Sequence, residues 1–254
     1  MSDQFGFEAR DFEADDRLLE ELLDRLELQE IGTGAGPQAP SPRPIFDFQF
    51  PVPAGCPPLT QADFNRIVRQ AVVEAIKLAN NAAGKLEAAV AVPRAMRGTE
   101  AQETAHLYTF FFCHDPSTAV PWAGNEPSGA TVAKRFRAIA RELGGGRRIR
   151  FRCDPNCHPT TRAHTDQLHE PNVINLCPLF FNPPAQPGLP PEGFRGGVVL
   201  HEMLHVLFTS FFHHGIARGE RRRNNAHCFR NFALRAMGYG QDNFAIHSCT
   251  DLPC

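Results

Sequence analysis

Apolar residues recur at helical spacing in four parts of the chain after residue 59. From Thr60 to about Leu86, apolar side chains follow one another every three or four residues, which is typical of an amphipathic helix. Thr60 followed by Asp63 resembles a capping box, the usual sign of a helix start. The same spacing predicts further helices over residues 130–143, 196–214 and 224–237.

Two shorter segments have the pattern of strands. Residues 148–153 alternate arginine with Ile149, Phe151 and Cys153, and residues 172–181 form a nearly continuous apolar run. A proline-containing loop at residues 183–191 separates the second run from the third helix. In sequence order, helices come both before and after a small group of strands, which predicts an α+β fold.

The first part of the chain differs in composition from the rest. Residues 1–31 hold eleven acidic residues and three arginines, and leucines at helical spacing predict a short amphipathic helix over residues 15–28. We expect this helix to fold onto the domain or to fray; a docking or export segment is the alternative. Residues 32–59 are rich in proline and glycine and predict a linker, so the domain is expected at residues 60–254.

Composition narrows the class of protein. A net charge of −2 over 254 residues gives no reason to expect a nucleic-acid partner, and no apolar run is long enough to cross a membrane. The N-terminus lacks the basic start and apolar core of a signal peptide, yet eight cysteines are unusual for a reduced compartment. A secreted or extracellular location is favoured, with the cytoplasm as the alternative, and we expect a monomer.

The segment 196–214 carries the clearest chemistry. It is mostly apolar, which predicts a buried helix, yet it contains His201, Glu202 and His205. Residues four apart share one helix face, so the two histidines can bind one Zn²⁺ ion, while Glu202 can take a proton from the attacking water. This is the His-Glu-x-x-His arrangement of zinc peptidases. Two hydrogen-bonded histidines in a buried helix are the simpler alternative.

A catalytic zinc ion requires a third protein ligand. The residue six positions after His205 is Phe211, so the metzincin pattern fails. Glu220 is the ligand that a gluzincin-like enzyme would use, but it follows His205 by only fifteen residues. His213 and His214 are the nearer candidates, and because adjacent helical residues point in different directions, only one of them is expected to bind.

At these residues the chain resembles the aspzincins, the deuterolysin and lysine-specific metalloendopeptidase family. The resemblance covers about residues 60–240 and is carried by four segments: Phe151-Arg-Cys153 with Cys157, Val173–Phe181, His201–His205, and Asn224-Asn-Ala-His227 followed by aromatics. It implies a zincin-like fold, a zinc-dependent endopeptidase activity on proteins or peptides, and a disulfide role for Cys153, Cys157 and Cys177. A structural zinc site at Cys153, Cys157 and His158, with His164 and His169 nearby, is the alternative for these cysteines.

The chain also departs from the family pattern. His214 stands about where the family has its third ligand, an aspartate, and His227 replaces the aspartate of Asn-Asn-Ala-Asp. The resemblance therefore implies three histidine ligands, with His214 first, then His213 and His227. The tyrosine that stabilises the oxyanion in the family has no counterpart, although Tyr239, Arg218 or the non-ligating histidine could replace it. A zinc-binding module without peptidase activity is therefore an alternative function, as is a gluzincin-like peptidase that uses Glu220.

Overall fold

The computed structural model describes residues 46–48, 55–120, 123–208 and 224–240. Its longer helices are α2 (Gln61–Ala91), α3 (Thr99–Phe112), α4 (Ser128–Arg141), α6 (Pro191–Leu207) and α7 (Ala226–Ala236), with shorter turns η1 (Arg94–Met96), η3 (Glu142–Gly146) and α5 (Pro178–Phe181). The strands are β1 (Phe46–Phe48), β2 (Ile149–Cys153), β3 (Ala163–His164) and β4 (Val173–Leu176). The predicted α+β class is confirmed, while the acidic helix predicted at residues 15–28 lies outside the described residues.

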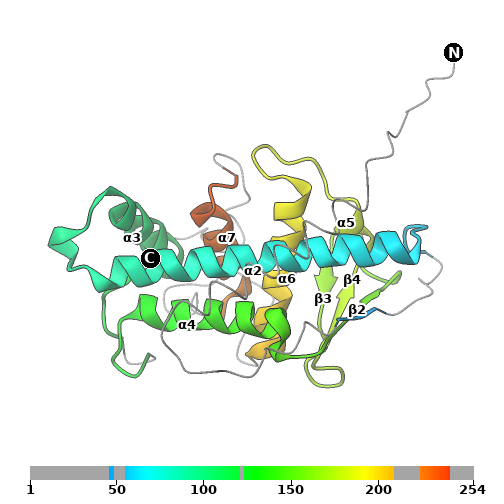
Figure 1. The fold of residues 1–254 in the computed structure, drawn as a ribbon, viewed down its shortest axis with the longest axis horizontal. Helices are drawn as coiled ribbons and strands as arrows, with labels where there is room; N and C mark the ends of the chain where they lie inside the picture. The colour runs from blue at the N-terminus through cyan, green and yellow to red at the C-terminus, as the bar shows by residue number, and fades with distance from the viewer. Residues whose placement is uncertain (1–45, 49–54, 121–122, 209–223, 241–254) are drawn as a thin grey trace, which may run out of the picture. The chain divides into compact units, whose positions relative to one another are not determined.

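Helix α2 is the element against which the other long helices pack. It begins where the sequence predicts, because the Thr60 side chain accepts a hydrogen bond from the Asp63 amide at 3.1 Å. It continues to Ala91, five residues beyond the predicted end, and contacts α3, α4, α6 and α7. Many of its buried positions are alanines, whose small side chains let neighbouring helices approach closely. Figure 1 shows α2 passing the strands near its start and α3 near its end.

A mixed four-stranded sheet lies near the start of α2, in the order β1-β2-β4-β3. Strand β2 pairs in parallel with β1 and with β4, whereas β3 pairs antiparallel with β4. Strands β2 and β4 were predicted, but β1 lies within the predicted linker and β3 was not predicted. The strand predicted over residues 172–181 is too long, because Pro178 opens α5 directly after it.

Helix α6 begins and ends earlier than the sequence pattern predicts. It starts at Pro191, inside the predicted loop, and it stops at Leu207, where Phe208 takes an extended backbone. The Gln167 side-chain amide donates to the His205 carbonyl at 2.6 Å, so a carbonyl of the last turn is satisfied without further helix. The prediction of a helix running to His214 is therefore wrong.

Stacked and edge-on aromatic rings join α3, α4 and α7 into one core. Within α3, Tyr108 stacks on Phe112 with ring centroids 4.7 Å apart. Phe136 of α4 lies 5.3 Å from Phe229 of α7 and 6.1 Å from Phe232 of the same helix. These rings are buried, so they fix the position of α7 relative to the rest of the helices.

Two disulfides cross-link the sheet. Cys56 is bonded to Cys153 at the end of β2, and Cys157 is bonded to Cys177 at the end of β4. The disulfide role predicted for Cys153, Cys157 and Cys177 is thereby confirmed. Cys113 and Cys228 are disulfide-bonded as well, whereas Cys249 and Cys254 lie outside the described residues. Among the described helices, none has the length and hydropathy required to cross a bilayer.

Replacing Gly196 by alanine should destabilise the fold. The added Cβ atom would lie 2.7 Å from Glu74 Cγ and 3.1 Å from the Ala75 backbone nitrogen, so α2 and α6 would have to separate. We expect the free energy of unfolding to fall by about 1–3 kcal/mol, measured by urea unfolding with the disulfides intact.

Gly84→Ala on α2 is the matched control. A Cβ atom there would lie 3.9 Å from the Arg137 Nη2 atom, in ordinary contact, so alanine should raise stability by about 0.5–1 kcal/mol through its helix propensity. Equal changes in the two variants would contradict the proposed close contact between α2 and α6.

Candidate metal centre

His201 and His205 lie one turn apart in the last part of α6, as the sequence predicts. Both side chains are buried, with relative exposures of 6% and 0%. Their Nε2 atoms are 3.3 Å apart, and their ring centroids are 5.0 Å apart. The helix therefore directs the same nitrogen of both imidazoles toward one point.

This spacing fits a shared metal ion. Zinc bound by imidazole has Zn–N distances of about 2.0–2.1 Å, and in a tetrahedral site two such nitrogens are about 3.3–3.4 Å apart. The observed 3.3 Å between the Nε2 atoms equals that separation. Two neutral imidazoles that share one proton could also sit at this distance, so the rest of the site has to distinguish the two interpretations.

Glu202 adds a buried carboxyl beside this pair. Its relative exposure is 3%, and within the described part of the chain its Oε2 atom accepts no hydrogen bond. Burial raises the pKa of Glu202 to about 8, an effect opposed by the nearby Thr165 hydroxyl and by the charge of Arg230. Buried carboxyls with strongly raised pKa values are typical of sites of proton transfer.

His227 approaches the histidine pair from α7. Its ring centroid is 4.5 Å from that of His201, and the Asn225 side chain caps α7 by accepting from the His227 amide at 2.9 Å. In the described residues these three imidazoles do not form a group whose ligand atoms all lie within 4.8 Å of one another. His227 is therefore next to His201, but it does not complete a set of three ligands in the present side-chain positions.

A glycine on α6 lets α7 come this close. A Cβ atom on Gly197 would lie 3.1 Å from Leu234 Cδ1 and 3.3 Å from Arg230 Cγ. Arg230 is 8% exposed, and burial, together with the charge of Arg162, lowers its pKa to about 9, while Glu202 acts in the opposite direction. The site thus contains a buried cation that sequence reasoning missed, although its position three residues after His227 on one helix face was a usable signal.

Three of the predicted or alternative ligands cannot be placed. His213, His214 and Glu220 all lie outside the described residues. The third-ligand prediction for His214, and the gluzincin alternative for Glu220, therefore stay predictions.

Neither tyrosine of the chain lies at the histidine pair. Tyr239 packs against Gly193, eight residues or about 12 Å along the helix axis before His201, and its hydroxyl donates to Glu74 at 2.9 Å. Burial and the Glu74 carboxylate raise the pKa of Tyr239 to about 12. Tyr108 is fully buried in the aromatic core. Tyr239 therefore links the segment that follows α7 to α2, and its hydroxyl is not positioned to stabilise an oxyanion at the histidine pair.

A second group of possible ligands lies at the sheet. The ligand atoms of Cys157, His164 and Cys177 lie within 4.8 Å of one another, and His164 Nε2 is 2.8 Å from Asp154 Oδ2. The two sulfurs are joined in a disulfide, however, and only a thiolate is an effective zinc ligand. In this oxidised form the group does not offer a metal site, and Cys153 belongs to a separate disulfide.

His158 and His169 do not join that group. The His158 ring contacts the Thr160 hydroxyl at 2.9 Å, and His169 lies 2.8 Å from the Asp166 carboxylate. Both contacts are local turns of the chain. The alternative of a structural zinc site at these residues is not supported by their positions.

After divalent metals are removed with a chelator, Glu202 should make the stability of the protein pH-dependent. Below about pH 4.5 the carboxyl is protonated in both states. Between pH 4.5 and about 8 only the unfolded chain releases the proton, so the free energy of unfolding should fall as pH rises.

The isosteric control is Glu202→Gln, which cannot ionise. Its melting temperature should exceed that of the metal-free wild type by a margin that grows from pH 5 to pH 8, measured by differential scanning calorimetry. A margin that stays constant over this range would show that Glu202 is not desolvated.

Comparison with known proteins adds no family assignment. No protein-family model matches the chain, and no curated protein matches its sequence at a significant level. The resemblance to the aspzincins therefore stays a prediction from the motifs. A function has to be argued from the residues around His201 and His205.

Proposed function

We propose that this chain is a zinc-dependent metalloendopeptidase with a zincin-like fold that hydrolyses peptide bonds in proteins or peptides. The observation that carries the proposal is the pair of His201 and His205 Nε2 atoms, 3.3 Å apart on a buried helix. Glu202 adds a buried carboxyl on the same helix turn. Zinc would compensate the desolvation of these polar groups, which an apolar helix otherwise has no reason to carry.

Glu202 is the residue proposed to move protons. A zinc ion bound at the histidines would act as a Lewis acid and lower the pKa of water. Glu202 would take a proton from the attacking water and deliver it to the leaving amine, which is the role of a general acid and base. Its burial on the same helix turn as the histidine pair supports this role, because the carboxyl is held close to the position of the proposed metal and its water. Arg230 is a buried cation available to stabilise negative charge that develops in the substrate.

We propose that His227 becomes the third ligand when its side chain turns toward the pair, with His214 as the alternative that the family resemblance favours. The support for His227 is its position against His201, 4.5 Å between ring centroids, on a helix start fixed by the Asn225 cap. Three histidines form a neutral donor set, which leaves the metal's positive charge undiminished. The same set would be reached with His214, whose position the structure does not describe.

Strand β3 supports a peptide as the substrate. In the described sheet β3 is one of the two edge strands, pairs antiparallel with β4 and contacts α6. Gln167 and Thr165, which follow β3 directly, reach the His205 carbonyl and the surroundings of Glu202. An extended peptide added to this edge would therefore pass close to the proposed metal site.

The alternative function is a zinc-binding module with weak or no peptidase activity. The observation in its favour is the placement of both tyrosines, since Tyr108 is in the core and Tyr239 is bonded to Glu74. Loss of one oxyanion-stabilising group lowers kcat by about 10²–10³. The two functions differ in whether an unfolded protein is cleaved at high enzyme concentration.

Glu202→Gln should separate metal binding from catalysis. The variant is expected to retain about one zinc ion per chain, measured by mass spectrometry. Its kcat/KM for an unfolded protein such as reduced casein should fall by about 10²–10⁴-fold, because the general base is lost. The control is Glu192→Gln, an exposed acid in the first turn of the same helix, which should change neither quantity. Undiminished cleavage by Glu202→Gln would refute the mechanism.

Alanine variants should identify the third ligand. After dialysis, His201→Ala and His227→Ala are expected to retain less than about half a zinc ion per chain, because a catalytic site needs three protein ligands. His214→Ala and Glu220→Ala should keep the metal, as should the control His169→Ala at an exposed side chain. Loss of zinc from His214→Ala but not from His227→Ala would assign the site to His214. Loss from Glu220→Ala alone would favour the gluzincin-like alternative.

A further inference from the structure

Three potential metal ligands meet beside the paired strands β2, β3 and β4. Cys157 follows β2 by four residues, His164 ends β3, and Cys177 directly follows β4. Their ligand atoms all lie within 4.8 Å of one another. Ligand atoms of a tetrahedral zinc ion are about 3.3–3.8 Å apart when Zn–N and Zn–S distances are about 2.0–2.3 Å. Small side-chain rotations would therefore bring the three groups to one ion once the Cys157–Cys177 bond is broken.

Main-chain hydrogen bonds hold these ligands together independently of the disulfide. The Cys177 amide donates to the Arg162 carbonyl at 3.0 Å, and His164 is part of the antiparallel pairing between β3 and β4. On the other side of β4, the Asp154 amide donates to the Leu176 carbonyl at 2.9 Å. The ends of the three strands would therefore stay paired after loss of the sulfur–sulfur bond, and the ligands would stay close together.

Asp154 gives His164 a partner that is typical of metal-binding histidines. Its Oδ2 atom lies 2.8 Å from His164 Nε2, and its Oδ1 atom accepts from the Asn156 amide at 2.9 Å. The bond from Asn156 and the contact with His164 lower the pKa of Asp154, which is therefore ionised at neutral pH. A carboxylate bonded to a metal-binding histidine fixes the ring and makes it a better ligand. The imidazole is thus oriented before any metal binds.

This group of residues is accessible from solvent. The side chain of His164 is 41% exposed, and that of Asp154 is 26% exposed. Cys157 is partly exposed as well, whereas Cys177 is buried. The group therefore lies at the surface of the protein, where a small reductant and a metal ion can approach it.

We propose that Cys157, His164 and Cys177 form a zinc site when their disulfide is reduced, separate from the site proposed at His201 and His205. A dithiol reductant gives two electrons and two protons to the sulfur–sulfur bond, so that two cysteine thiols form and the reductant becomes a disulfide. Zn²⁺ then binds both thiolates and the imidazole, and the two thiol protons pass to solvent. The fourth position of the tetrahedral ion is left to water. The same residues thus hold zinc in a reducing compartment and a disulfide in an oxidising one.

The first test measures Co²⁺ binding to the full chain. Co²⁺ accepts the nitrogen and sulfur ligands of zinc, and its bonds to thiolates absorb strongly in the near ultraviolet, unlike its bonds to histidine. The protein is reduced with dithiothreitol, desalted without oxygen and titrated with Co²⁺. The reduced wild type should gain this absorption, and the oxidised wild type should not. The double variant Cys157→Ser/Cys177→Ser should not gain it in either state, because both thiolates are lost.

Variants of the other groups test the remaining parts of the site. In the reduced chain, His164→Ala should weaken Co²⁺ binding by about tenfold or more, because one of three protein ligands is lost. Asp154→Ala should weaken it by about 10–100-fold, the usual effect of removing the partner of a ligating histidine. Two matched controls should bind like the wild type: His158→Ala, an exposed histidine in the same loop, and Cys56→Ser/Cys153→Ser, which removes the neighbouring disulfide.

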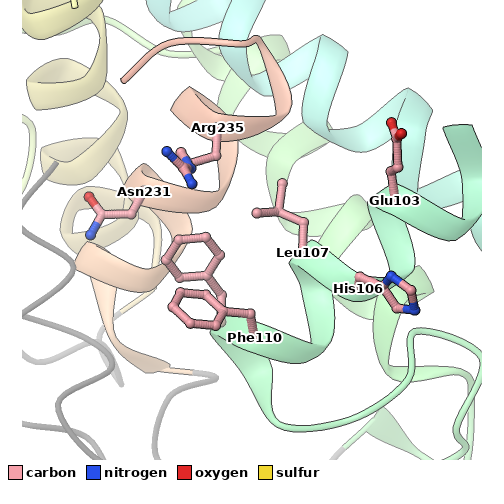
Figure 2. Close-up of a pocket in the computed structure, with 7 residues that line it drawn as sticks. Glu103, His106, Leu107, Phe110, Asn231 and Arg235 are labelled. Atoms are coloured by element: carbon pink, nitrogen blue, oxygen red, sulfur yellow. The ribbon is translucent and has the colours of Figure 1, made fainter. Parts of the chain in front are cut away.

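His106→Ala is a control in another part of the molecule. His106 lines a pocket of about 360 Å³ between α3 and α7, and its ring contacts the Gln102 side chain at 2.7 Å. Figure 2 shows that its ring points away from Asn231 and Arg235, and none of the described residues that line this pocket is a cysteine. The variant removes an imidazole with a side-chain partner, as His164→Ala does, and it should leave Co²⁺ binding unchanged.

The second test locates the metal by its protection of thiols. Zinc should slow the alkylation of Cys157 and Cys177 in the reduced chain by about tenfold or more, because a metal-bound thiolate is a weaker nucleophile. The rates are measured for each cysteine by mass spectrometry after peptide digestion. Cys56 and Cys153 should react equally with and without zinc. Equal protection of all four cysteines, undiminished thiolate absorption in His164→Ala, or no such absorption in the reduced wild type, whether folded or unfolded, would overturn the site.

Discussion

The close packing of α6 between α2 and α7 is the constraint on which the proposed site depends. Two adjacent glycines make it possible: Gly196 faces Glu74 on α2, and Gly197 faces Arg230 and Leu234 on α7. Because side chains are absent at these points, α7 can bring His227 to the ring of His201. The helix that carries the histidine pair is therefore buried on most sides, and its polar groups are held in an environment from which water is largely excluded.

The sequence predicts local structure well where periodicity and caps agree. The start of α2 follows from Thr60 and Asp63, and β2 follows from its alternation of apolar residues with arginine. It fails where pairing between distant segments decides the outcome. Strands β1 and β3 are three and two residues long, so they have no period of their own and exist because β2 and β4 offer partners. The end of α6 was also missed, and there the His205 carbonyl accepts a hydrogen bond from Gln167, 38 residues earlier in the chain, a partner that local periodicity does not reveal.

In the candidate site, too, the sequence predicts contacts within one helix but not contacts between elements. Spacing within one helix predicts that His201 and His205 converge, and the structure places their Nε2 atoms 3.3 Å apart. The neighbours supplied by other elements could not be derived from spacing: His227 and Arg230 come from α7, and Thr165 follows β3. His227 was ranked last among the histidines because the family pattern places a ligand nearer to His214. Position along the chain and proximity in the fold thus favour different third ligands.

In the proposed mechanism, the charges around the histidine pair would link metal binding to protonation of Glu202. Without a metal, Glu202 is desolvated and its pKa is about 8, while Arg230 is itself buried and its pKa is lowered to about 9. The attraction between the two groups offsets only part of the cost of removing each of them from water. A divalent cation held by neutral imidazoles would add positive charge next to Glu202 and favour its ionised form. In the proposed mechanism, metal binding would therefore release a proton from Glu202, so that the proposed general base becomes available when the metal is bound.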